Sequence, residues 1–239
     1  MELLYEFING TEEERKIIDD IIEFINKKYS EKLDLNILKK VEIVDRLENK
    51  SSGRSFVDKI VLPRKYGLEN VHFKKNFIEN IESDSILNML ISTIYHELWH
   101  VSTWDKYAIM YEYILSENNV DMCTALAYKY WIEYIAHIET VFMEVFEIMS
   151  TFCNNFVHKR WHRMEYGYQY FMIGLPYYLV RSQYLQLYDN LTKKIECEEL
   201  RKTVYDFDKD SKLLLDNKNI NDIEKANIIK ERVKKLFNI

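Results

Sequence analysis

The sequence predicts a helix-dominated α+β fold, with a small N-terminal β-sheet and a helical C-terminal extension. Five glycines and two prolines in 239 residues are too few for the many special turns of a sandwich or barrel. Apolar residues recur at helical spacing over most of the chain, whereas short β-type runs gather between residues 31 and 80. The length suits one compact domain with elaborations, or two small ones, and we expect a single domain over residues 1–239.

The composition narrows the class of protein. Hydrophobic residues make up 47% and charged residues 30%, which is ordinary for a folded soluble chain and excludes a disordered one. A net charge of −6 argues against nucleic acid as a partner. No apolar run of about 20 residues predicts a membrane span, and residues 1–7 lack the basic start of a signal peptide. Three widely spaced cysteines, Cys123, Cys153 and Cys197, predict reduced thiols. We therefore expect a cytoplasmic protein.

The first predicted element is a helix within residues 1–30. Thr11 is a good N-cap, and Glu14 three residues later completes a capping box. Five isoleucines then follow at helical spacing, with Glu and Lys on the opposite face; they are Ile17, Ile18, Ile21, Ile22 and Ile25. The helix is expected to end near residues 28–30.

Residues 31–80 predict a small sheet of two to four strands. The β-type runs are centred on residues 41–43, 56–57, 60–62 and 71–73, and residues 49–53 and 63–67 have the composition of turns. His72 lies in the last run. A lone histidine in a strand is expected at an edge or on a face rather than as a metal ligand.

Residues 81–150 predict two long helices. The first begins with the polar run Ser83-Asp84-Ser85, ends near Val101 or Trp104, and carries one apolar stripe made of Leu87, Leu90, Ile91, Ile94, Leu98 and Val101. Met89, Thr93, His96 and His100 lie nearly opposite this stripe, at about 100° per residue. The second helix is expected to be capped by Asn119 and to run to about residue 150. Residues 151–239 predict further helices.

Catalytic chemistry is predicted at His96-Glu97-Leu98-Trp99-His100. Residues i and i+4 lie one turn apart on the same helix face, so two imidazoles can hold one Zn²⁺ at about 2.0–2.1 Å. The glutamate between them points beside the metal and can accept a proton from metal-bound water. The alternative interpretation is two surface histidines on a solvated helix face.

A catalytic zinc site needs a third protein ligand, and the sequence offers three candidates. Asp105 could reach the metal only if the first helix ended before it. Glu133 is the stronger candidate, because it belongs to a polar stripe on an otherwise apolar helix, formed by Lys129, Glu133, His137, Thr140 and Glu144. His137 is either a partner of the ligand or a rival ligand. The alternative is that this stripe faces water.

Together these residues resemble a known group. His96-Glu97-Leu98-Trp99-His100, followed by Glu133-Tyr134-Ile135-Ala136, resembles the zincin metallopeptidases whose third ligand is a glutamate. The pattern is most similar to the ImmA/IrrE-type metallopeptidases of bacteria and their mobile elements, over roughly residues 40–145. The resemblance implies a zincin-like domain in which His96, His100 and Glu133 bind Zn²⁺ and Glu97 is the catalytic base. It further implies a bacterial or phage hydrolase that cleaves peptide bonds in peptide or protein substrates.

Three features leave alternatives open. Trp99 stands where the family usually has glycine, so we expect a reshaped cleft. The residue that stabilises the oxyanion could be any of His158, His162, Tyr166 and Tyr168. The second candidate function is a non-catalytic, zincin-like interaction protein of a mobile element or toxin system, which binds a partner without cleaving it.

Overall fold

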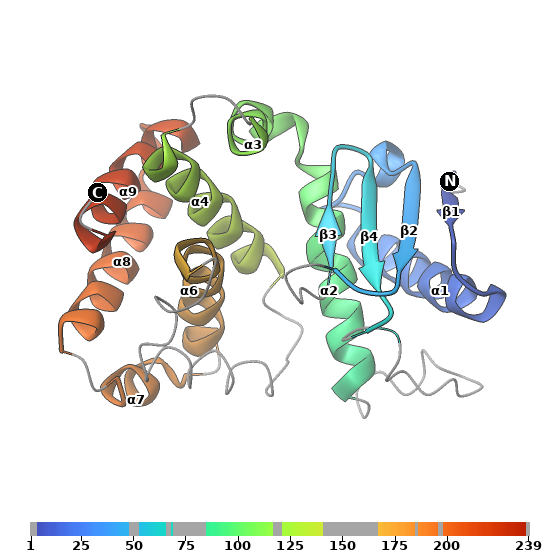
Figure 1. Cartoon of the computed structure of the whole chain (residues 1–239), viewed down its shortest axis with the longest axis horizontal. Coiled ribbons are helices and arrows are strands. Elements are labelled where there is room, and N and C mark those ends of the chain that lie inside the picture. Colours follow the sequence, from blue (N-terminus) through green and yellow to red (C-terminus); the bar gives the residue numbers. More distant parts are fainter. Residues whose placement is uncertain are drawn as a thin grey trace. The chain divides into compact units, whose positions relative to one another are not determined.

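The computed structural model confirms a helix-dominated α+β fold with a small N-terminal sheet (Figure 1). It describes residues 4–47, 53–65, 68, 85–116, 121–140, 167–184, 186–195 and 198–237. The chain divides into two compact units. The first consists of residues 1–106 with 142–145, and the second of residues 107–141 with 146–239.

The first unit begins with a parallel β–α–β arrangement. Strand β1 (Glu6–Ile8) is followed by α1 (Glu12–Tyr29), a short 3₁₀ turn (Leu35–Ile37) and β2 (Lys40–Val44), which pairs in parallel with β1. The predicted capping box of α1 is confirmed. The Glu14 backbone N–H donates to Thr11 Oγ1 over 3.2 Å, and the Thr11 N–H donates to the Glu14 carboxylate over 2.7 Å. The sequence did not predict β1.

The sheet has four strands in the order β1-β2-β4-β3. Strand β4 (Lys59–Pro63) runs parallel to β2, with Val41 opposite Ile60. Strand β3 (Arg54–Ser55) is antiparallel to β4 and forms one edge. The β-type run at residues 56–57 lies between these two strands rather than inside one. The predicted strand at 71–73, with His72, lies outside the described residues.

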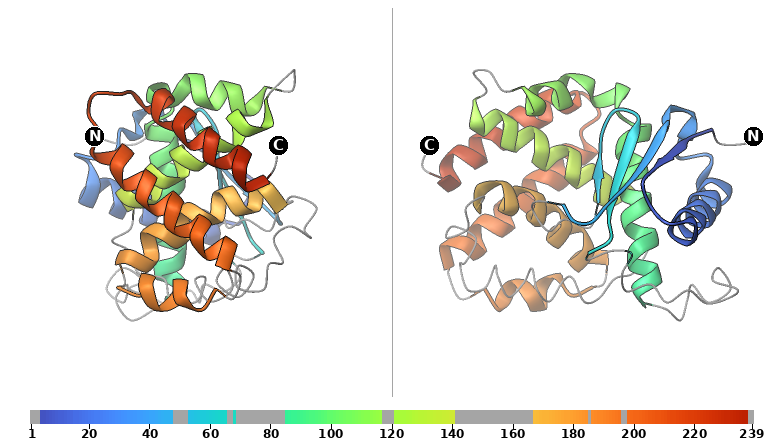
Figure 2. Two further views of the ribbon diagram at one scale, coloured as in Figure 1. Left: turned by 90° about the vertical axis from the view of Figure 1, so that its left-hand side faces the viewer. Right: turned by 45° about the vertical axis from the view of Figure 1, so that its right-hand side comes forward.

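Helix α2 (Ser85–Ser102) packs against β3 and β4, and α1 packs against α2. Both helices lie on the same side of the sheet (Figures 1 and 2). The predicted apolar stripe is buried throughout, with exposed fractions of 3% or less for Leu87, Leu90, Ile91, Ile94, Leu98 and Val101. Because this stripe is fixed against the first unit, the directions of the remaining faces of α2 are fixed as well.

The second unit is helical where it is described, which confirms the predicted C-terminal extension. Helix α4 (Met122–Thr140) is its centre and packs against α3 (Ala108–Leu115), α6 (Gly167–Tyr184) and α9 (Asp222–Phe237). Helices α7 (Tyr188–Lys193) and α8 (Glu198–Asp216) lie between α6 and α9 in the chain. The core of this unit contains large aromatic side chains, and the polar atoms of two of them have hydrogen-bond partners. The buried Tyr130 hydroxyl lies 2.8 Å from Ser211 Oγ, and Trp131 Nε1–H donates to Asp222 over 3.0 Å.

The cap of α4 differs from the prediction. Asp121, not Asn119, precedes the first turn. Its Oδ1 accepts from the Cys123 backbone N–H over 3.0 Å, and its Oδ2 accepts from the Thr124 hydroxyl over 2.9 Å. Lys230 of α9 forms an ion pair with the same carboxylate, and this contact is the main reason why the pKa of Asp121 falls to about 2. One side chain thus begins α4 and ties it to α9.

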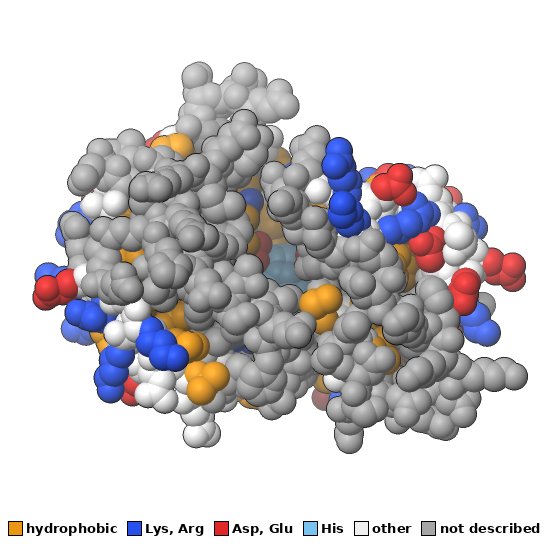
Figure 3. Space-filling model, turned by 60° about the horizontal axis from the view of Figure 1, so that its bottom comes forward, with side chains coloured by type: hydrophobic (Ala, Val, Ile, Leu, Met, Phe, Trp, Pro, Cys, Tyr) orange, Lys and Arg blue, Asp and Glu red, His pale blue; other side chains and the backbone are white. Residues whose placement is uncertain are grey.

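None of the described helices combines the length and hydropathy needed to cross a bilayer. On the face in Figure 3, the described Lys and Arg side chains lie among Asp and Glu side chains. The mixed charge agrees with the modest net charge of −6.

The cap at Asp121 gives a test of how α4 is held. Asp121→Ala removes the acceptor for the first turn and is expected to cost about 1 kcal/mol at pH 7, whereas Asp121→Asn keeps an acceptor and costs less. The pKa of Asp121 in the folded protein lies below its value in the unfolded chain. The ionised carboxylate therefore stabilises the fold above about pH 4, and this stabilisation is lost as the pH falls toward 2. Thermal unfolding at pH 7 and pH 2 measures both effects. If Asp121→Asn is destabilised relative to wild type by the same amount at pH 2 as at pH 7, the ion pair between Asp121 and Lys230 is contradicted.

Candidate metal centre

Helix α2 brings two imidazoles together. His96 Nε2 and His100 Nε2 lie 3.0 Å apart, and the two rings meet edge to face with their centroids 4.6 Å apart. Two nitrogens bound to one tetrahedral Zn²⁺ at 2.0–2.1 Å stand about 3.3 Å from each other. The observed separation therefore matches a pair of ligands for a single ion after a small adjustment.

The histidine pair does not lie on a fully solvated helix face. His100 is buried, with 4% of its surface exposed, and His96 is partly exposed. Trp99, also buried, places its ring 5.4 Å from the His100 ring at 78°. The Trp99 indole thus packs against His100, a predicted ligand, and restricts the rotation of the His100 ring. The interpretation as two surface histidines is wrong for His100.

Glu97 lies between the two histidines in the sequence and is 9% exposed. The helix presents its side chain toward the start of β3, where Gly53 lies against it. A metal-assisted hydrolase needs a carboxylate close to its metal for proton transfer. The role of Glu97 as this base stays a prediction.

Helix α4 carries the other predicted ligand. Glu133 and His137 are one turn apart, with 3.9 Å between the carboxylate and His137 Nε2, and each side chain is less than one fifth exposed. The His137 ring packs against Tyr177 of α6, at 5.3 Å between centroids and 73°. Thr140 is fully buried and donates to the Ala136 carbonyl. The polar stripe of α4 is therefore covered at His137 and Thr140, and the interpretation that it faces water is wrong there.

A buried cation lies near this stripe in the second unit. The Arg181 guanidinium is 5.9 Å from the centre of the Tyr177 ring, and Arg181 is 4% exposed. Its burial lowers the pKa of the guanidinium, although arginine stays charged at neutral pH. A Nη2–H of Arg181 faces the carbonyl of Thr140.

His96 and His100 belong to the first unit and Glu133 belongs to the second. Two imidazoles and one carboxylate of this kind could together hold a metal ion. No further group of this kind occurs among the residues that the structure describes. His137 and the exposed Asp105 are not members. Two imidazoles with one carboxylate are a donor set typical of catalytic zinc, so the residues fit the metal that the sequence predicted.

Several predicted residues lie outside this description. His72, His158, His162 and Tyr166 are not among the described residues, and the Tyr168 side chain is not described. The identity of the oxyanion-stabilising residue therefore stays a prediction. Cys123 is buried and free, as predicted.

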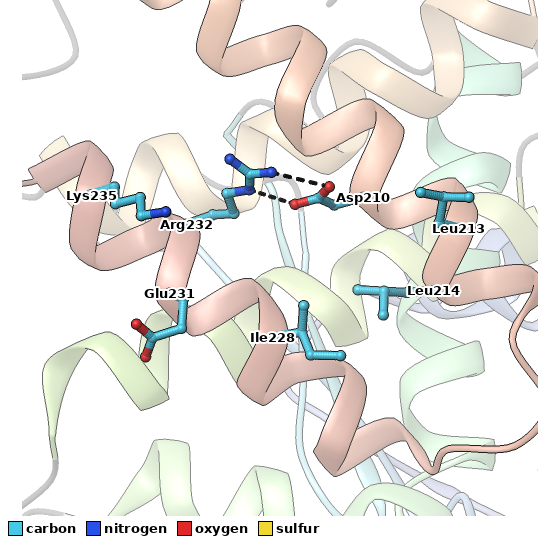
Figure 4. A pocket seen from close by; sticks show the side chains of 7 residues that line it. All are labelled: Asp210, Leu213, Leu214, Ile228, Glu231, Arg232 and Lys235. Atoms are coloured by element: carbon cyan, nitrogen blue, oxygen red, sulfur yellow. Dashed lines mark hydrogen bonds and ion pairs between the residues drawn. The ribbon is translucent and has the colours of Figure 1, made fainter.

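A concave region lies on α8 and α9. It is a surface pocket of about 380 Å³ lined by Asp210, Leu213, Leu214, Ile228, Glu231, Arg232 and Lys235 (Figure 4). Arg232 binds the Asp210 carboxylate through two nitrogens. The charge of Asp210 is already neutralised by this bidentate contact. We therefore interpret the pocket as a groove where two helices pack, and not as a reactive site.

No family model, curated protein or solved structure matches the chain. Its function is therefore inferred from the residues and their geometry.

The histidine pair leads to a test of metal binding. His96→Ala removes one of two adjacent nitrogen donors and is expected to abolish most zinc binding after purification and dialysis against a weak chelator. Met89→Ala is the matched control, because Met89 lies on the same side of α2 and offers no strong zinc donor. Elemental analysis of wild type and both variants measures the effect. Equal zinc content in wild type and His96→Ala contradicts the assignment.

Proposed function

We propose that this protein is a zinc-dependent metallopeptidase of the zincin type, similar to the ImmA/IrrE-type enzymes. One observation carries the proposal: His96 and His100 direct Nε2 atoms at each other from one helix, 3.0 Å apart, with buried Glu97 between them in the sequence. Imidazoles that share a metal, next to an acid that is no ligand, are the minimum set for metal-assisted hydrolysis.

In this proposal His96, His100 and Glu133 would hold Zn²⁺. Bound zinc supplies a Lewis acid, which stabilises negative charge and lowers the pKa of water. Trp99 and the covered position of His100 keep one imidazole oriented. His137 lies beside Glu133 and packs on Tyr177, so it is placed to orient the carboxylate rather than to replace it as a ligand.

Glu97 performs the proton transfer. Its carboxylate accepts a proton from the attacking water, whose oxygen forms the new bond to the scissile carbonyl carbon. The same proton then passes to the amine that leaves as the peptide bond breaks. Glu97 returns to its carboxylate form, so protons balance over one turnover. Low exposure limits exchange with bulk water during this transfer.

The substrate is a peptide or protein. Strand β3 pairs with β4 on one side and is the outer strand of the described sheet, next to α2. An extended peptide can add to such an edge through main-chain hydrogen bonds, which would place its carbonyl groups near the helix that bears Glu97.

A non-catalytic, zincin-like interaction protein is the second candidate. The observation in its favour is that 3.0 Å between the two imidazole nitrogens is also the length of a direct hydrogen bond. A protein that used the pair in this way would need no metal. Zinc in the purified wild type favours the enzyme, and its absence under zinc-replete expression favours the interaction protein.

The role of Glu97 is tested by Glu97→Gln. The amide keeps the size and most hydrogen bonds of the acid but cannot take the proton. We expect zinc content equal to wild type and at least a roughly 10²–10⁴-fold loss of kcat. Cleavage of a mixed peptide library, read by mass spectrometry, measures the activity. If the variant retains activity within about threefold of wild type, Glu97 has no part in the mechanism.

The third ligand is tested separately with Glu133→Ala. Loss of a direct ligand is expected to weaken zinc binding by more than about 100-fold, beyond the roughly 10–100-fold typical of a group that only supports a ligand. Lys129→Ala, one turn earlier on the same stripe, is the control. Competition with a chromophoric chelator gives the affinities. A Glu133→Ala affinity within threefold of wild type, alongside a large loss in His96→Ala, rules out the glutamate ligand.

A further inference from the structure

Gly53 lies directly before β3 and is buried. A Cβ atom added to it would stand 2.8 Å from Glu97 Cγ, 2.9 Å from Glu97 Oε1 and 3.0 Å from Thr93 Cγ2. Carbon atoms in favourable contact are about 3.5–4.0 Å apart. The φ angle of Gly53 lies outside the left-handed region, so close approach, and not an unusual backbone conformation, is what requires a glycine here.

The contact limits where the Glu97 side chain can go. Glutamate has three rotatable side-chain bonds, and an isolated glutamate on a helix samples several rotamers. Here the Gly53 backbone lies against both the middle and the end of the Glu97 side chain and prevents the side chain from moving in that direction. Thr93, one turn earlier on α2, occupies the neighbouring space. Strand β3 and α2 pack directly against each other in the first unit. This packing fixes the position of the Gly53 backbone relative to Glu97.

We propose that Gly53 is a positioning residue for Glu97, whose absent side chain lets the backbone before β3 hold the carboxylate in one orientation. The inference rests on the proposed function in one respect only, the use of Glu97 in proton transfer. The contact between positions 53 and 97 stands without it. A misplaced base costs rate even when the metal and substrate bind normally.

The contact is tested by a double-mutant cycle read in thermal unfolding, which needs neither metal nor activity. Gly53→Ala overpacks the site and is expected to lower Tm by roughly 2–10 °C. In a Glu97→Ala background, which lacks Cγ and Oε1, most of that loss disappears. Ser55→Ala, two residues further along the same segment, is expected to have the same effect in both backgrounds. Equal losses for Gly53→Ala in both backgrounds overturn the contact.

The positioning role is tested by steady-state kinetics on a peptide that the wild type cleaves. Gly53→Ala is expected to lower kcat at least tenfold, with KM within threefold and zinc content unchanged. Adding Thr93→Ala removes one of the crowded atoms and is expected to restore part of kcat. A Gly53→Ala kcat equal to wild type overturns the positioning role even if the unfolding cycle shows coupling.

The two measurements also separate this inference from the proposed function. A wild type that holds no zinc and cleaves no peptide overturns the peptidase proposal and, with it, the catalytic use of the contact. Coupling between positions 53 and 97 would still be decided by the unfolding cycle. If the wild type cleaves peptides but the effects of Gly53→Ala and Glu97→Ala on unfolding are additive, the peptidase proposal stands and the inference about Gly53 fails.

Discussion

The burial of the apolar stripe of α2 is the constraint on which the candidate metal centre depends. Six aliphatic side chains along this helix are 3% exposed or less, and burial of each contributes roughly 1.5–3 kcal/mol. Rotation of the helix about its axis would expose them. With the rotation fixed, the 100° step per residue also fixes the directions of His96, Glu97 and His100. The imidazoles meet because they are four residues apart, and the acid points to β3 because it is adjacent to one of them.

Local sequence patterns were sufficient for a large part of the fold and of the site. The Thr11–Glu14 capping box involves residues three positions apart, and α2 was bounded by its own periodicity. The histidine pair follows from spacing on one helix. Each of these features depends on neighbours within about one or two turns, so the sequence carries them directly. The proposal that Glu133 is a ligand rests on more, namely a polar stripe on an apolar helix together with a weak family resemblance.

Features that depend on distant segments were not predictable in the same way. Strand β1 is three residues long and exists because Phe7 pairs with Val41 across α1, and three residues are too few for an alternating pattern to be recognised. The burial of His100 depends on tertiary packing. The closeness of Gly53 to Glu97 arises only when β3 packs on α2. The cap of α4 was placed two residues early because Asn119 and Asp121 are both good cap residues, and the choice was made by contacts with Thr124 and Lys230.

The central claim is that this chain binds zinc through His96, His100 and Glu133, and X-ray absorption at the zinc edge on the purified wild type tests it most directly. We expect one zinc per chain, with two imidazole nitrogens at about 2.0–2.1 Å and a carboxylate oxygen at about 2.0–2.2 Å from the metal. A chain that contains no zinc after zinc-replete expression, or a zinc spectrum without imidazole scattering, would contradict it.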